Sequence, residues 1–313
     1  MSKKIPIKEG PLQPERQVSR RSVALRLKPY RALGLLSPGL FFLLLIYSGA
    51  LLSLFVFSFF RYSASGVEIM QKTFVLENYI RFLGDPFYLK VLWNTFKIAF
   101  IVTAICLVMG YPISYFMVRT RSRFGRRVIM MTVFISFLVS VLVRIFSWII
   151  ILGQNGLLNN FMVLIGIIDE EHRMQLLGNI YGTIVGLTHI LLPFMVLTLV
   201  GVLKGIHPSV EEASQNLGAN KAQTFLKVTL PLSLPAISAG SLLVFTLAIS
   251  SFAVPLLLGG PSDRMISNYI YDAFLQFANY PFGAAMSFIL LFLTLILVLI
   301  QMRVLQTRLL AGG

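Results

Sequence analysis

The sequence predicts an all-α, polytopic membrane protein with six transmembrane helices. Of its 313 residues, 57% are hydrophobic and only 12% are charged, whereas a typical soluble domain has roughly 25% charged residues. The mean hydropathy is +0.81. A soluble fold of this length could not cover so much apolar side chain without leaving large exposed patches. An ordinary soluble enzyme is therefore excluded.

Six apolar runs form the predicted spans, each long enough at about 1.5 Å per residue to cross a ~30 Å hydrocarbon core. The second, fourth and fifth contain Pro112, Pro193 and Pro255. Proline kinks a spanning helix and frees a carbonyl that packed neighbours can satisfy. The predicted spans are residues 36–60, 91–118, 128–152, 183–205, 234–258 and 283–303.

The net charge of +15 is distributed unevenly about these spans. Segments 1–35, 119–127, 204–227 and the C-terminal tail together carry 19 basic and 4 acidic residues, while the alternate loops carry 6 and 8. The positive-inside rule then places both termini in the cytoplasm, with tails at 1–35 and 304–313. Nucleic acid is not an expected partner, because the cations flank spans instead of covering one folded face. Membrane lipid is the expected surrounding.

The chemistry-bearing residues give no sign of an enzyme. The single cysteine, Cys106, excludes a disulfide framework. The three histidines lack metal-ligand spacing, and no GxxxxGK[ST] phosphate loop occurs. We therefore expect no catalytic residue, no metal site and no cofactor on this chain; if ATP powers the protein, ATP and Mg bind to another subunit.

One polar segment, residues 206–231, is too long to be a simple turn. Its first part has helical periodicity, and Gly218 is placed to end that helix. Asn220 can cap a second short helix. The segment therefore predicts two short helices that project into the cytoplasm. The residues that share the face of the first are Val210, Ala213, Ser214 and Leu217.

This segment resembles the EAA loop of permease subunits of binding-protein-dependent ABC importers. Seven positions match the spacing of that pattern, with Ser for Ala and Val for Ile as mild departures: Glu212, Ala213, Ser214, Gly218, Val228, Leu230 and Pro231. The resemblance implies the type I ABC importer permease fold (MetI-like) and a coupling helix that docks on an ATPase subunit. The implied ATPase-coupling residues are Glu211, Glu212, Ala213, Ser214, Gly218 and Pro231.

Four further stretches resemble the polyamine-type branch of these permeases: 110–123, 141–160, 251–270 and 279–287. The resemblance implies a multi-pass protein of the bacterial inner membrane that moves a small charged organic solute by alternating access. Its implied partners are two ATP-binding cassette subunits, a second homologous permease and a periplasmic or surface substrate-binding protein. In polyamine members an acid commonly follows the proline at Pro255, where this chain has Leu256. An amino-acid-like or opine-like solute is therefore an alternative to a polyamine.

Ionisable and polar residues in or near the spans are candidates for the pathway: Arg144, Trp148, Asn155 and Lys97. An ionisable group inside a span usually faces the protein interior or a water-filled cavity. Packing is the alternative for Arg144, and interfacial placement is the alternative for Lys97 and Trp148. Gly259, Gly260 and Asp263 are candidates for an outer gate, with an ordinary turn as the alternative.

An ATP-independent secondary transporter or channel is the alternative function. It would explain six spans but leaves the 206–231 loop without a role. The spans also lack the carboxylates that ion coupling often uses.

Overall fold

The computed structural model describes residues 29–63 and 70–311, and side chains for 37–63 and 70–303. The described part is mostly helical; its one sheet is the antiparallel pair β1 (Arg61–Tyr62) and β2 (Met70–Gln71). The predicted all-α class is confirmed. The predicted N-terminal tail lies outside the described residues up to residue 28.

The chain divides into two units, residues 1–51 and 52–313. In the first unit the structure describes residues 29–51, which belong to α1 (Pro29–Phe57). Large apolar side chains from Leu40 to Tyr47 are exposed on it. Such a surface suits a helix surrounded by lipid.

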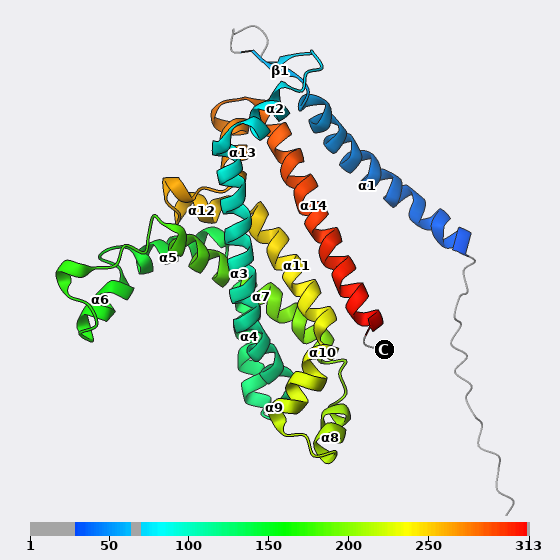
Figure 1. Cartoon of the computed structure of the whole chain (residues 1–313), viewed down its shortest axis with the longest axis vertical. Helices are drawn as coiled ribbons and strands as arrows, with labels where there is room; N and C mark the ends of the chain where they lie inside the picture. The colour runs from blue at the N-terminus through cyan, green and yellow to red at the C-terminus, as the bar shows by residue number, and fades with distance from the viewer. Residues whose placement is uncertain (1–28, 64–69, 312–313) are drawn as a thin grey trace, which may run out of the picture. The chain divides into compact units, whose positions relative to one another are not determined.

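The core of the second unit is formed by three long helices, α3 (Pro86–Arg119), α7 (Ile180–Leu203) and α11 (Leu234–Ser250), which pack against one another (Figure 1). Small residues allow the close approach. A Cβ on Gly240 of α11 would lie 2.8 Å from the Met195 sulfur of α7. Close helix approach at small residues is the usual packing of membrane helices.

The two ends of the second unit carry different short elements (Figure 1). One end carries α2 (Glu77–Gly84), α13 (Ile266–Tyr271), the π-helix η4 (Asp272–Gln276) and the start of α14 (Tyr280–Ala311). The other end carries α8 (Pro208–Asn216) and α9 (Lys221–Thr224). The predicted loop therefore protrudes from the end opposite α2 and α13.

The third predicted span, 128–152, is not one helix. The chain forms α4 (Arg123–Leu138) and α5 (Val141–Leu152), separated by extended backbone at Val139 and Ser140. After α5 a turn leads into α6 (Leu157–Leu164), and both extend away from α3 in Figure 1. Neither Pro nor Gly marks the break at 139–140, so the hydrophobic run reads as continuous.

The fifth predicted span, 234–258, is also interrupted. Helix α11 ends at Ser250, and α12 (Ala253–Leu257) follows a break. Side chains satisfy the freed carbonyls, because Ser267 donates to Ser251 at 2.7 Å and Asn268 donates to Phe252 at 2.8 Å. Backbone breaks at membrane depth are tolerated where protein groups satisfy them.

Five segments of the described chain are long and apolar enough to cross a membrane, or six if one bent pair counts as a span. The five segments are Ser37–Phe57, Pro86–Arg119, Val141–Leu164, Ile180–Leu203 and Tyr280–Arg303. The bent pair is Lys221–Leu232 with Leu234–Ser250, at 63°. Pro235 lies in the first turn of α11, where its missing N–H costs nothing.

Candidate functional site

Helix α8 begins and ends with local hydrogen bonds. Ser209 N donates to the His207 ring at 3.2 Å, and Pro208 occupies the first turn. At the other end, Ala219 N donates to Ser214 O at 3.2 Å and Gly218 N to Gln215 O at 3.0 Å. This pair of bonds is a Schellman ending. Gly218 has φ +91°, which a residue with a Cβ adopts only with strain.

The second arm of the loop starts at Asn220, whose side chain accepts from Gln223 N at 2.8 Å while Gln223 accepts from Asn220 N at 3.0 Å. This capping box opens α9. The π-helix η2 (Phe225–Thr229) and α10 (Leu230–Leu232) continue towards α11. A hydroxyl pair joins the two arms, because Ser214 and Thr224 lie 3.2 Å apart.

Glu211 anchors α8 to the transmembrane core. Its side chain forms an ion pair of 2.8 Å with Arg119, the last residue of α3. Arg119 also donates from Nε to the same carboxylate at 3.1 Å and to the carbonyl of Ile206 at 3.0 Å. Thr229 of η2 donates to Glu211 at 2.9 Å, and Tyr115 of α3 at 3.4 Å. One buried carboxylate therefore joins α3, α8 and η2.

The opposite surface of α8 has no such contacts. Glu212 and Ala213 are exposed, and Leu217 is 90% exposed. Val210 is also exposed, so most of the predicted apolar face is uncovered in the described chain. Ser214 is the exception, since its hydroxyl bonds to Thr224. Of the predicted coupling residues, Pro231 is exposed in α10, and only Glu211 is buried.

Sequence reasoning missed the three residues that hold Glu211: Arg119, Tyr115 and Thr229. In the sequence, Arg119 is one of the cations that flank a span. The spacing of the loop gives no sign of this contact, because the ion pair joins residues 92 positions apart.

Two candidate pathway residues, Arg144 and Trp148, lie one turn apart on α5. Arg144 Nη1 reaches the Ser136 hydroxyl of α4 at 3.4 Å, across the break at 139–140. Its Nε is buried with no hydrogen-bond partner in the described ranges. The Trp148 ring meets the His189 ring of α7 edge to face at 5.6 Å. Arg144 and Trp148 therefore join α4, α5 and α7.

The other two candidates lie apart from this cluster. Lys97 is exposed on α3. Asn155 belongs to the turn before α6, where its side chain accepts from Arg173 at 3.1 Å and its carbonyl accepts from Asn160 at 3.2 Å. In residues 29–63 and 70–311, no group of three or more His, Cys, Asp or Glu could hold a metal ion.

The candidate gate residues Gly259 and Gly260 lie against α7. A Cβ on Gly259 would lie 2.6 Å from the Thr183 hydroxyl, and one on Gly260 would collide with the carbonyl of Gly178. Asp263 belongs to the short helix η3 (Pro261–Asp263) and bonds through its backbone to Gly260 at 3.0 Å. The two glycines permit close packing of this segment on the start of α7.

The apolar spans of the described chain and its projecting loop are those of a multi-pass membrane protein. The chain belongs to the family described as "Binding-protein-dependent transport system inner membrane component", whose model matches residues 107–310.

Curated relatives cover most of the chain. It is 36% identical over 236 residues to the "Spermidine/putrescine transport system permease protein PotB" of Escherichia coli (strain K12). The matched region covers 75% of this chain and 84% of that protein. The protein of the same name from Haemophilus influenzae is 36% identical over 228 residues, or 73% of this chain and 78% of that protein.

Solved structures share the fold. A chain from a "bacterial ABC transporter involved in the import of the acidic polysaccharide alginate" has a TM-score of 0.66 at 18% identity, covering 89% of this chain and 96% of that one. A chain from the "MetNI methionine ABC transporter" has a TM-score of 0.54 at 20% identity, covering 69% and 93%. The fold is that of MetI-type ABC permeases, as the resemblance predicted.

Proposed function

We propose that this chain is one of two homologous permease subunits of an ATP-driven importer. A binding protein delivers a small charged organic solute, and the solute crosses the inner membrane by alternating access. The loop 206–231 faces the cytoplasm, and α8 docks on one of two ATP-binding cassette subunits. ATP and Mg bind to those subunits.

One observation carries this proposal: α8 is fixed on one side and uncovered on the other. Glu211 ties it to α3 and η2, while Glu212 and Leu217 are exposed on the loop. A displacement of α8 would therefore move α3 and, through α10, α11. The exposed apolar residues suit the core of a protein interface, and Glu212 suits a polar rim. A coupling helix needs both properties.

The solute class is supported by the relatives named for spermidine and putrescine transport. We propose an amine-bearing organic solute on this basis. Leu256 is partly buried in α12, so this position supplies no carboxylate for a dication. An amino-acid-like solute is therefore a second candidate, in addition to a polyamine.

The test is ATP hydrolysis and uptake by the complete complex in proteoliposomes, loaded with its binding protein. We expect Glu212→Lys to abolish solute-stimulated ATP hydrolysis and uptake, because a cation replaces the carboxylate on the docking face. Ala222→Lys, an exposed position on α9, is the matched control and should keep most of the activity. Uptake that persists without the ATPase subunits would overturn the proposal in favour of an ATP-independent transporter.

A further inference from the structure

A cavity of about 430 Å³, called the polar cavity for the two charged side chains in its wall, is lined by elements that lie at the end of the second unit opposite α8 (Figure 1). Its walls come from β1, α2, α3, α13, η4 and α14, which are far apart in sequence. The residues that line it include Arg81, Tyr88, Tyr269, Asp272 and Phe282. Ionised side chains of both signs therefore line one cavity.

The negative charge is Asp272, which is 5% exposed. Its Oδ2 accepts from Arg264 at 2.7 Å. Its Oδ1 is buried and has no hydrogen-bond partner among the residues that the structure describes. A buried carboxylate oxygen without a donor is costly, so this atom is an acceptor that a bound donor would satisfy.

The positive charge is Arg81 of α2. Its guanidinium carbon lies 4.7 Å from the centre of the Phe282 ring, a cation–π contact. Within the described chain, no carboxylate lies in ion-pair range of Arg81; the three ion pairs found there involve other arginines. Stacking on the ring leaves the N–H edge of a guanidinium free for an anion.

Aromatic rings form the walls between these charges. Tyr88 meets Phe282 at 5.2 Å and Tyr269 at 6.5 Å between ring centres, both edge to face. Burial raises the pKa of the Tyr269 hydroxyl, which Arg264 only partly offsets. The hydroxyl therefore stays protonated at neutral pH. Apolar walls with a few placed polar groups are typical of small-molecule sites.

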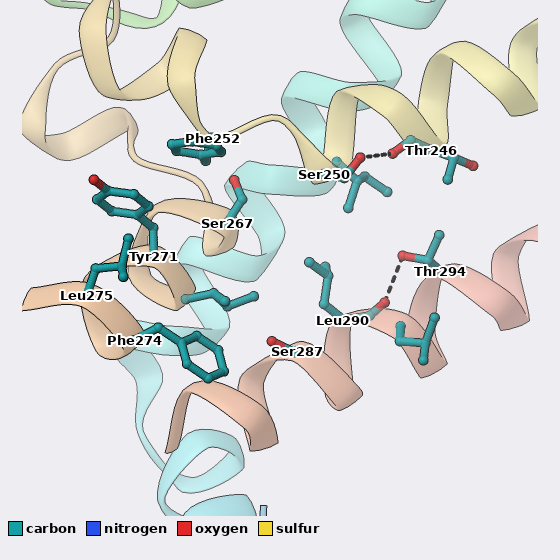
Figure 2. A pocket seen from close by; sticks show the side chains of 13 residues that line it. Thr246, Ser250, Phe252, Ser267, Tyr271, Phe274, Leu275, Ser287, Leu290 and Thr294 are labelled. Carbon is teal, nitrogen blue, oxygen red and sulfur yellow. Dashed lines mark hydrogen bonds between the residues drawn. The ribbon is translucent and has the colours of Figure 1, made fainter. Parts of the chain in front are cut away.

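A larger cavity of about 620 Å³ lies between α11, α13, η4 and α14, and it lacks these features (Figure 2). Its serine and threonine hydroxyls already donate to backbone carbonyls: Thr246 to Leu242, Ser250 to Thr246, Ser267 to Ser251, Ser287 to Gly283 and Thr294 to Leu290. Of these two cavities, the polar cavity has, within the described chain, a carboxylate oxygen without a donor and an arginine without an ion-pair partner.

The charges select the ligand. Arg264 and Arg81 outnumber Asp272, so a dication would add repulsion, while a simple anion would leave Asp272 Oδ1 without a donor. A zwitterion satisfies both groups without changing the net charge. We propose that this cavity binds a small zwitterionic solute whose ammonium group donates to Asp272 and whose carboxylate pairs with Arg81. The bound zwitterion is the transported solute, which is the part that rests on the proposed importer function.

Four probes of one carbon-chain length test the charge requirement. They are γ-aminobutyrate (a zwitterion), putrescine (a dication), butylamine (a cation) and butyrate (an anion). Binding is measured by equilibrium dialysis on the complete complex in nanodiscs, without ATP and without the binding protein. Binding measured in this way does not depend on coupling to ATP hydrolysis. A failure of ATP-driven uptake would therefore leave the binding equilibrium at the cavity unchanged.

Two variants and one control locate the binding. Asp272→Asn removes the carboxylate charge at nearly constant shape. Arg81→Gln removes the cation at an exposed position, so it tests the site even if Asp272→Asn fails to fold. Glu77→Gln is the control, because Glu77 lies on the same helix as Arg81, is exposed and pairs with Arg61 at 3.2 Å outside the cavity.

We expect the wild-type complex to bind γ-aminobutyrate at least tenfold more tightly than the other three probes. Arg81→Gln and Asp272→Asn should each weaken that binding tenfold or more, and Glu77→Gln should leave it unchanged. Tighter binding of putrescine, equal binding in Arg81→Gln and wild type, or no binding of any probe to the folded wild-type complex would each overturn the proposal.

Discussion

Arg119 and Glu211 are separated by 92 residues, yet their side chains meet at 2.8 Å. The Glu211 oxygen that accepts a hydrogen bond from Arg119 also accepts one from the Thr229 hydroxyl, at 2.9 Å. The end of α3, the helix α8 and the segment η2 therefore share one anchor. Neither α8 nor η2 can shift on α3 without breaking these bonds.

The first prediction concerns this anchor. Glu211→Gln leaves the largely buried guanidinium of Arg119 without its anion, and such a loss costs about 3 kcal/mol of folding stability. We expect a lower melting temperature of the purified complex and weaker coupling of ATP hydrolysis to uptake. The double variant Glu211→Gln/Arg119→Met, which removes both charges, should recover much of the stability. A double variant that is less stable than Glu211→Gln would contradict the anchor.

The second prediction concerns the corner of the loop. In Gly218→Ala the new Cβ meets nothing within 4 Å, so the cost comes only from φ +91°. That conformation costs about 1–2 kcal/mol for a residue with a Cβ. We expect full-length protein in the membrane with reduced solute-stimulated ATP hydrolysis, and Gly218→Asn should lose less than Gly218→Ala because Asn tolerates this region better. Equal activity of both variants and wild type would show that the Schellman ending is dispensable.

A third prediction compares two glycines of α7. A Cβ on Gly182 would lie 2.6 Å from the carbonyl oxygen of Leu258 and 2.8 Å from that of Leu176, whereas one on Gly201 meets nothing within 4 Å. Gly182→Ala should therefore destabilise the fold by about 2 kcal/mol through overpacking against backbone. Gly201→Ala should be neutral or stabilising, because alanine favours a helix by up to about 1 kcal/mol. Thermal unfolding in detergent gives both values, and the reverse order would refute close packing at Gly182.

The fourth prediction separates two roles for Arg144. Its hydrogen bond to Ser136 joins α4 to α5, so we expect Arg144→Ala to lower the melting temperature and the maximal rate of uptake. The KM for solute should stay unchanged, because the bond holds helices together. A raised KM at unchanged stability would place Arg144 in the pathway instead. Ser136→Ala is the companion variant, since it removes the same bond while leaving the charge.

The sequence predicts the helical class and the two-armed loop because hydrophobic run length and the Gly and Asn signals are local. Gly218 and Asn220 act as predicted, with one ending α8 and the other capping α9. The anchor at Glu211 could not be predicted, because Arg119 reaches it only through tertiary packing. The break after Leu138 carries no Pro or Gly, and the break after Ser250 is stabilised by the distant Ser267 and Asn268. The cavity at Asp272 combines six elements, so no local motif marks it.

Leu217 is 90% exposed at the tip of the proposed coupling loop. A leucine at such a tip gains from burial only when another subunit covers it, at roughly 25 cal/mol per Å² of apolar surface removed from water. Under the proposed function, a copy of this permease without its ATPase subunit would leave this apolar tip exposed to water. In that function, docking of the ATPase subunit would therefore add apolar burial at this tip to the polar contacts of Glu212.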